Sequence, residues 1–157
     1  MASTISAATL TVTISESITL NGYERGSSNS LSIGSINEVM TRVITVPTSE
    51  ISAINTGAEN ASGTWKKADI RYIRLTNKDD TNFVLVNIIG NSSDEALIKV
   101  DAGCSFILFA DQSAGFATVT SFSGGALSVP SAPGDVEAMN LCADTAAVDV
   151  EIFIALV

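Results

Sequence analysis

The fold is decided by one stretch of sequence, Val148-Asp149-Val150-Glu151-Ile152-Phe153-Ile154-Ala155-Leu156. Apolar residues occupy every second position from Val148 to Leu156, and Asp149 and Glu151 fall between them. Because side chains of a β-strand project alternately to the two faces of its sheet, this spacing predicts a strand with one buried face. A helix would need apolar residues at every third or fourth position instead.

The same two-residue period returns along the rest of the chain. Asn21-Gly22, in which both residues tolerate positive φ, is a strong turn signal that ends the extended stretch at Leu20. The pattern predicts an all-β protein, an antiparallel β-sandwich of jelly-roll type with about eight to ten short strands. Besides Val148–Leu156, the expected strands are Thr9–Ile14, whose extended pattern continues at Ile18–Leu20, and Val39–Val46, Ser49–Ile54, Ile70–Leu75, Phe83–Ile89, Ala96–Asp101, Cys104–Phe109, Phe116–Phe122 and Val136–Cys142.

We expect residues 1–157 to form a single domain, in which residues 1–14 could be an N-terminal arm or a swapped strand. Val136–Cys142 and Val148–Leu156 are expected to form a hairpin, with the turn at Asp144-Thr145-Ala146. The two cysteines, Cys104 and Cys142, are expected to be small buried side chains, since free cysteine is among the most buried residue types.

Two Ser-, Gly- and Asn-rich segments, Tyr23–Ser35 and Asn55–Gly63, are predicted to be exposed loops. A helix could be accommodated only at Glu50–Ala61 or Val136–Asp144.

Composition excludes several classes of function. The 157 residues hold 8 Lys+Arg, 17 Asp+Glu and no His, giving a net charge of -9. Nucleic-acid binding is disfavoured, because phosphate contacts need a basic surface. Without histidine there is no Ser-His-Asp or Cys-His nucleophile and no histidine metal ligand, so we expect no enzyme and no cofactor. Only carboxylate, Lys or Tyr chemistry would remain. We also expect no signal peptide, transmembrane helix or membrane partner.

The charges are unevenly distributed. Five of the eight cations lie within one predicted strand and its flanks, whereas residues 100–157 contain seven acids and no cation. Two interpretations stay open: the cations solvate this strand and pair with acids such as Asp69, or the edge docks on an acidic surface of another subunit. The five cations are Lys66, Lys67, Arg71, Arg74 and Lys78.

An apolar companion to this basic edge is predicted at Phe83–Ile89, whose residues are apolar on both faces. Tyr72 and Trp65 are expected to be core or interface anchors. The candidate interface therefore consists of the five cations with Tyr72, Phe83 and Leu85. Asp79-Asp80 could suggest a calcium site, but a polar hairpin turn explains the pair as well.

Three pieces of sequence resemble small structural proteins of tailed bacteriophages, especially marine and cyanobacterial ones. They are Leu20-Asn21-Gly22-Tyr23-Glu24-Arg25-Gly26, Arg74-Leu75-Thr76-Asn77 before an apolar strand, and Asp101-Ala102-Gly103-Cys104-Ser105-Phe106-Ile107-Leu108. The resemblance implies a β-sandwich virion component, either a head decoration (cement) protein or a tail component. It supplies no catalytic residues.

We therefore expect a non-enzymatic head decoration protein that stabilises the capsid as an oligomer. Its expected partners are copies of itself, with a trimer favoured, and other virion proteins such as the major capsid protein. It would be made in the cytoplasm of the host bacterium and end in the virion. The alternative is a tail-tip or fibre module that recognises host carbohydrate through exposed loops, with contacts at Tyr23, Glu24 and Arg25.

Overall fold

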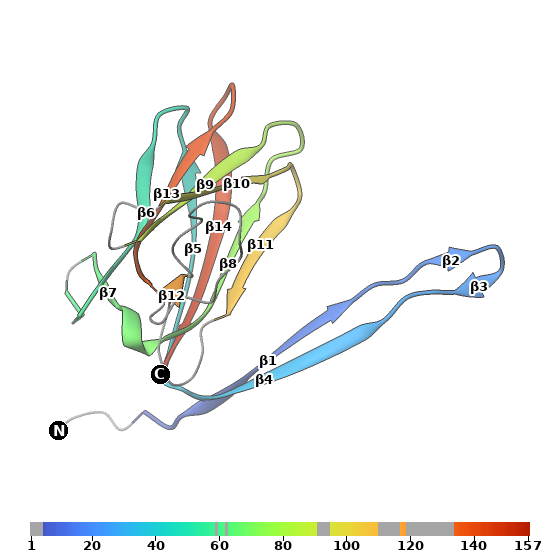
Figure 1. The fold of residues 1–157 in the computed structure, drawn as a ribbon, viewed down its shortest axis with the longest axis horizontal. Helices are drawn as coiled ribbons and strands as arrows, with labels where there is room; N and C mark the ends of the chain where they lie inside the picture. Colours follow the sequence, from blue (N-terminus) through green and yellow to red (C-terminus); the bar gives the residue numbers. More distant parts are fainter. Residues whose placement is uncertain (1–4, 59, 62, 91–94, 110–116, 119–133) are drawn as a thin grey trace, which may run out of the picture.

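Two sheets, antiparallel except for one short parallel edge strand, pack face to face in the computed structural model, which describes residues 5–58, 60–61, 63–90, 95–109, 117–118 and 134–157 (Figure 1). The four-stranded sheet has the order β11 (Ser105–Phe109), β8 (Ile70–Asn77), β14 (Val148–Leu156) and β5 (Glu38–Val46). The six-stranded sheet has the order β10 (Glu95–Val100), β9 (Val84–Gly90), β13 (Gly134–Ala143), β6 (Ile51–Gly57) and β7 (Trp65–Lys66), with β12 (Ala117–Thr118) also paired to β13. The predicted all-β sandwich is confirmed.

The core lies between the two sheets and follows the alternation of the sequence. On β14, Val148, Val150, Ile152 and Ile154 are completely buried. They belong to one apolar cluster with residues of the facing sheet, such as Met139. Burial of so many aliphatic side chains, each contributing about 1.5–3 kcal/mol, is what holds the sheets together.

The predicted hairpin between Val136–Cys142 and Val148–Leu156 is wrong. β13 pairs with β6 and β9 in one sheet, and β14 pairs with β5 and β8 in the other. Both strands carry a fully apolar face. Between β13 and β14 the chain passes from one sheet to the other, so the apolar faces of the two strands pack against each other in the core. Each strand also has two hydrogen-bonded neighbours in its own sheet.

Both segments where a helix could have been accommodated form strands. Glu50–Ala61 contains β6, which begins at Ile51 and runs on to Gly57, past the predicted end at Ile54 and into the predicted loop. Val136–Asp144 falls in β13. The described helical segment is η1 (Lys67–Asp69), a 3-10 turn between β7 and β8. Of the predicted strand Phe116–Phe122, only Ala117–Thr118 is among the described residues, and it is extended.

A long hairpin projects from the sandwich (Figure 1). It is formed by β1 (Ala8–Ser15), β2 (Thr19–Leu20), β3 (Tyr23–Glu24) and β4 (Ser28–Ile36), and we call residues 8–36 the arm. The turn predicted at Asn21-Gly22 is confirmed, with φ values of 53° and 81°. The predicted loop Tyr23–Ser35 is wrong, because most of it is strand. The Ser-rich composition favours a loop, although Leu31 and Ile33 have the two-residue spacing of a strand.

Candidate functional site: the arm and the sheet face beneath it

The arm has one apolar and one hydroxylated face. In the pairing of β1 with β4, Leu10 lies opposite Ile33 and Val12 opposite Leu31. Directly opposed residues of an antiparallel pair project to the same side, so these four share a face. The intervening pairs on the other face are Thr11 with Ser32 and Thr13 with Ser30, and the last two hydroxyls are 2.9 Å apart.

The base of the arm packs on the outer face of the four-stranded sheet. Ile33 and Ile36 of the arm are buried together with Tyr72 of β8 and Ala155 of β14. The Tyr72 ring stands edge-on to that of Phe153, with centroids 5.8 Å apart, an arrangement that aromatic pairs favour. Burial raises the pKa of the Tyr72 hydroxyl, with a smaller opposing effect of the Arg74 charge. This contact is a second apolar cluster, separate from the core between the sheets.

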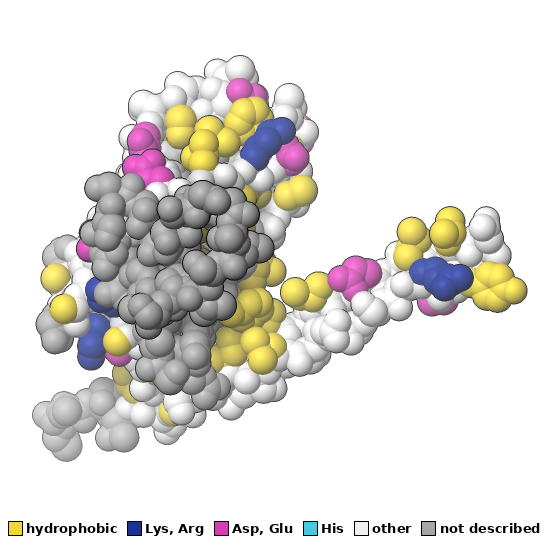
Figure 2. Space-filling view, in the orientation of Figure 1, with side chains coloured by type: hydrophobic (Ala, Val, Ile, Leu, Met, Phe, Trp, Pro, Cys, Tyr) yellow, Lys and Arg dark blue, Asp and Glu magenta, His cyan; other side chains and the backbone are white. Residues whose placement is uncertain are grey.

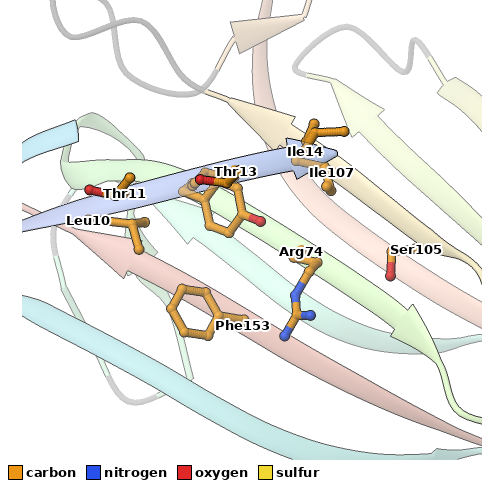
Figure 3. A pocket seen from close by; sticks show the side chains of 10 residues that line it. Leu10, Thr11, Thr13, Ile14, Arg74, Ser105, Ile107 and Phe153 are labelled. Atoms are coloured by element: carbon orange, nitrogen blue, oxygen red, sulfur yellow. The ribbon is translucent and has the colours of Figure 1, made fainter. Parts of the chain in front are cut away.

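A groove of about 380 Å³ remains between the arm and the sheet (Figure 3). Leu10 and Ile14 of β1 form one wall, and Phe153 and Arg74 belong to the sheet. The Arg74 guanidinium lies 5.8 Å from the centre of the Phe153 ring and forms an ion pair with Glu151. The groove lining thus combines apolar side chains with the hydroxyls of Thr11, Thr13 and Ser105 and one paired cation.

Beyond the groove, the arm exposes large apolar side chains. Ile14 and Leu31 continue its apolar face outward, and Ile18, Leu20 and Tyr23 follow at the far end. Leu20 is 57% exposed and Tyr23 69%. Figure 2 shows these hydrophobic side chains gathered at the far end of the arm. We call Ile18, Leu20 and Tyr23 the arm tip.

Glu24 orders the arm tip from within. Its carboxylate accepts hydrogen bonds from the backbone N–H of Gly26 at 3.0 Å and of Ile18 at 3.1 Å, and from the Thr19 hydroxyl at 3.2 Å. These bonds, that from Gly26 first, hold the pKa of Glu24 below its ordinary value. Gly26 must be glycine, because a Cβ would lie 2.1 Å from the carbonyl oxygen of Glu16.

The three predicted loop contacts therefore have different places in the arm. Tyr23 is exposed at the tip, whereas the carboxylate of Glu24 is used in holding the turn. Arg25 donates its backbone N–H to the carbonyl of Ile18 at 2.8 Å. Sequence reasoning missed Ile14, Ile18, Leu20 and Leu31 as a surface. The signal was their near-symmetrical placement about Asn21-Gly22, which indicates a hairpin with one apolar face.

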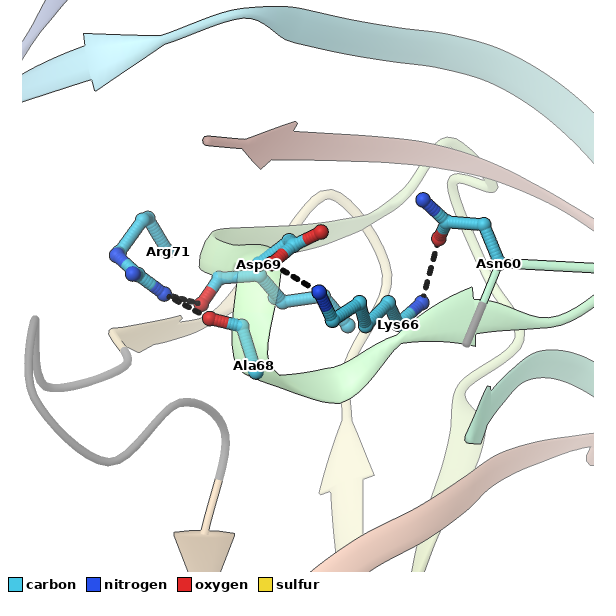
Figure 4. A network of polar contacts seen from close by, with 6 residues as sticks. Asn60, Lys66, Ala68, Asp69 and Arg71 are labelled. Atoms are coloured by element: carbon cyan, nitrogen blue, oxygen red, sulfur yellow. Dashed lines mark hydrogen bonds and ion pairs between the residues drawn. The ribbon is translucent and has the colours of Figure 1, made fainter. Parts of the chain in front are cut away.

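The predicted basic edge is largely occupied by contacts within the chain (Figure 4). Lys66 Nζ lies 3.6 Å from Asp69, the pairing that the first interpretation expected. Arg71 donates to the carbonyl oxygens of Ala68 at 2.6 Å and Ile70 at 3.1 Å. Lys78 donates its backbone N–H to the backbone carbonyl oxygen of Asp149. Lys67 lies in η1, close to these residues in the chain.

Phe83 and Leu85 do not join this edge in one surface. Leu85 alternates with buried Val84 and Val86 on β9, so it projects from the outer face of the six-stranded sheet. Tyr72 and Arg74 project from the outer face of the other sheet, toward the arm. The ring of Phe83 is 4.6 Å from Lys99 Nζ. Tyr72 and Arg74 thus lie on the opposite side of the sandwich from Leu85.

The carboxylate of Asp79 is engaged in a turn. It accepts the backbone N–H groups of Thr81 and Asn82, both at 2.7 Å, and these bonds lower its pKa. Within the described ranges, no three His, Cys, Asp or Glu side chains are grouped closely enough to hold a metal ion.

Cys104 is exposed, so the prediction that it is buried is wrong. It follows Gly103, which has a φ of 71° in the turn before β11. Cys142 is half-buried, and its Sγ lies 3.2 Å from the Thr48 carbonyl.

Comparison with known proteins gives no match to a family model, to a curated protein or to a solved structure. Among the described residues, none of the helical segments has the length and apolar character needed to cross a membrane.

Proposed function

We propose that this protein is a non-enzymatic structural component of a phage virion, a head decoration protein that binds the capsid as an oligomer and stabilises it. The observation that supports the proposal most is the arm. It leaves the sandwich with an apolar face that its own sheet covers only at the base. Exposed apolar surface of this kind marks sites of protein–protein contact.

We also infer that the eight main strands of the sandwich form a jelly roll. The orders β11-β8-β14-β5 and β10-β9-β13-β6 support this, because the chain changes sheet at nearly every step and its first and last sandwich strands, β5 and β14, are neighbours. Two Greek keys in a double sheet give such an order. Viral capsid and lectin domains use this architecture, which agrees with a virion protein.

The charged side chains of the groove and of the arm turn support attachment rather than catalysis. The Arg74 guanidinium is paired with Glu151, and the Glu24 carboxylate accepts hydrogen bonds from its own turn. In a decoration protein, many weak contacts repeated around a shell add up to firm binding. The expected partners are other copies of the chain and the major capsid protein.

Locating the protein in purified particles tests the proposal. Particles of a phage whose genome encodes this protein are purified, analysed by mass spectrometry and imaged by cryo-electron microscopy with a labelled antibody. We expect the protein at many copies per particle, on the head. Its absence from intact particles would overturn the proposal.

The second candidate is a tail-tip or fibre module that binds host carbohydrate. Tyr23 favours it, because an exposed aromatic ring at the end of a projecting element can stack on a sugar. A glycan array with the wild-type protein and the Tyr23→Ala variant separates the two candidates. Binding that is lost in the variant supports this function, and no binding to any glycan contradicts it.

A further inference from the structure

We propose that the arm tip of one copy docks on the outer face of the four-stranded sheet of a second copy, on the β5 side that the second copy's own arm leaves open. The proposed occupant of that face is therefore the arm of another copy of this chain. The inference concerns the purified protein, and it holds or fails separately from the assignment to a virion.

The donor surface is a continuation of a contact that the molecule already makes. The face of the arm that buries Ile33 against Tyr72 continues to Ile14 and Leu31. Farther out, the apolar side chains of the arm tip are exposed in the described part of the chain. An isolated two-stranded hairpin is at best marginally stable in water. A partner that covers the outer half of the arm would stabilise it in the way the sheet stabilises the base.

The acceptor surface lies on the sheet that already binds an arm. In the pairing of β5 with β14, Val39 lies opposite Ala155 and Val43 opposite Glu151, so both valines project from the outer face. The arm of the same chain lines its groove with residues of β8, β11 and β14. Val39 and Val43 remain 52% and 56% exposed. β5 is the edge of this sheet, so the open strip is accessible from the side.

One pair of opposite charges is available for contact between two copies. Arg25 is the cation of the arm, and it lies next to the tip. The acceptor strip is bordered by the Asp149 carboxylate, which accepts a 2.6 Å hydrogen bond from Thr45 on the same face. Since each copy has a net charge of -9, copies repel one another unless local pairs of opposite sign are brought together. Arg25 and Asp149 supply such a pair.

Molar mass in solution tests the proposal directly. Light scattering coupled to size exclusion, over a concentration series, is applied to the wild type, Leu20→Asp, Val43→Asp and a matched control, Leu97→Asp. Leu97 is 66% exposed on β10 of the other sheet. All three variants replace exposed apolar side chains, so circular dichroism should show unchanged folding.

We expect the wild type and Leu97→Asp to be oligomers, and Leu20→Asp and Val43→Asp to be monomers at the same concentrations. A monomeric wild type would overturn the proposal. So would association that survives both Leu20→Asp and Val43→Asp, or that is lost in Leu97→Asp instead. A wild type that is monomeric alone but binds particles through Leu20 would assign the arm to a different virion protein.

Cross-linking identifies the two surfaces. Cys104 and Cys142 are first replaced by Ser, and a Leu20→Cys copy is mixed with a Val43→Cys copy. Under mild oxidation we expect a disulfide-linked pair containing one copy of each, and none from Leu20→Cys mixed with Leu97→Cys. Equal yields from the two mixtures would contradict the docking site. Self-association of a protein that is absent from virions would support this inference while overturning the proposed function.

Discussion

Glu24 illustrates how one surface carboxylate can hold a projecting element in shape. The residue is fully exposed, yet it accepts bonds from two backbone N–H groups and a hydroxyl on both sides of the arm turn. Gly26 permits this geometry, because any larger residue would collide with the Glu16 carbonyl. The arm tip is therefore presented in a defined conformation, which lowers the entropy that a docking partner must overcome.

The order of the arm tip should depend on pH. The pKa of Glu24 in the folded protein is lowered from its ordinary value of 4.5, so its contribution is present above that value and is lost as the pH falls through the lowered pKa. We expect the protection factors of the Ile18 and Gly26 amides, which correct exchange for its intrinsic pH dependence, to fall at low pH while β14 stays protected. In Glu24→Ala, which removes the accepting oxygens, protection of these amides should already be low at neutral pH. Unchanged exchange in this variant would contradict the role of Glu24.

Ile152 is a core position that tests the sandwich itself. Its side chain is completely buried on β14, between the two sheets. Ile152→Ala should lower the free energy of unfolding by about 2–5 kcal/mol, from lost burial and the cavity left behind. Urea denaturation measures the change. Val43→Ala, at an exposed position of β5, should cost far less, and equal losses in the two variants would contradict the assigned burial.

At the scale of elements, the arm and the sandwich are held by two different apolar clusters. The larger one lies between the sheets, and the smaller one joins Ile33 and Ile36 of β4 to Tyr72 and Ala155 on the outer sheet face. Because the two clusters share no residue, the arm can loosen without unfolding of the sandwich.

Removing the Tyr72 side chain should loosen the arm selectively. Tyr72→Ala deletes the ring that packs against Phe153 and the arm base. We expect faster hydrogen exchange throughout β1 and β4, with β9 and β13 still protected, as followed by mass spectrometry. Leu97→Ala, on the opposite sheet, should leave exchange in the arm unchanged. Equally accelerated exchange in β9 and β13 would contradict the independence of the two clusters.

Local alternation and turn chemistry could be predicted from the sequence, whereas pairing over distance could not. β5, β8, β9, β11 and β14 follow their predicted ranges closely, because each is a short run of apolar and β-branched residues, alternating or continuous, between turn residues. β4 was predicted to be a loop because its Ser-rich composition outweighed two apolar positions. The prediction that β13 and β14 form a hairpin is wrong for a different reason. Their short separation along the chain favours pairing, but each has an apolar face, and these faces are buried by packing against each other across the core.

The candidate site shows the same division between local and distant features. Tyr23, Glu24 and Arg25 are predicted as contacts of an exposed loop, and they lie instead at the end of the arm, where Tyr23 and Glu24 form β3. Tyr72, Arg74 and Leu85 do not lie on one surface. The sequence could not show this, because the prediction assumes that residues near in sequence share a surface. The sheet to which each strand belongs separates them, and that depends on the whole topology.

At the scale of the whole molecule, body and arm suit different tasks. The sandwich supplies a rigid platform with an open strip at Val39 and Val43, and the arm carries apolar side chains away from that platform. One chain thus has both a projecting donor and an acceptor face. Such a subunit can link to neighbours around a symmetric shell, where a closed ring satisfies every donor and every acceptor.

We propose that this protein attaches to a phage head as an arm-linked oligomer. Co-sedimentation of the purified protein with heads that lack it, comparing the wild type, Leu20→Asp and Leu97→Asp, tests this proposal. We predict saturable binding of the wild type and of Leu97→Asp, and binding reduced at least about 10-fold for Leu20→Asp, because a monomer loses the gain from multiple contacts. No binding of the wild type, or equal binding of all three proteins, would contradict the claim.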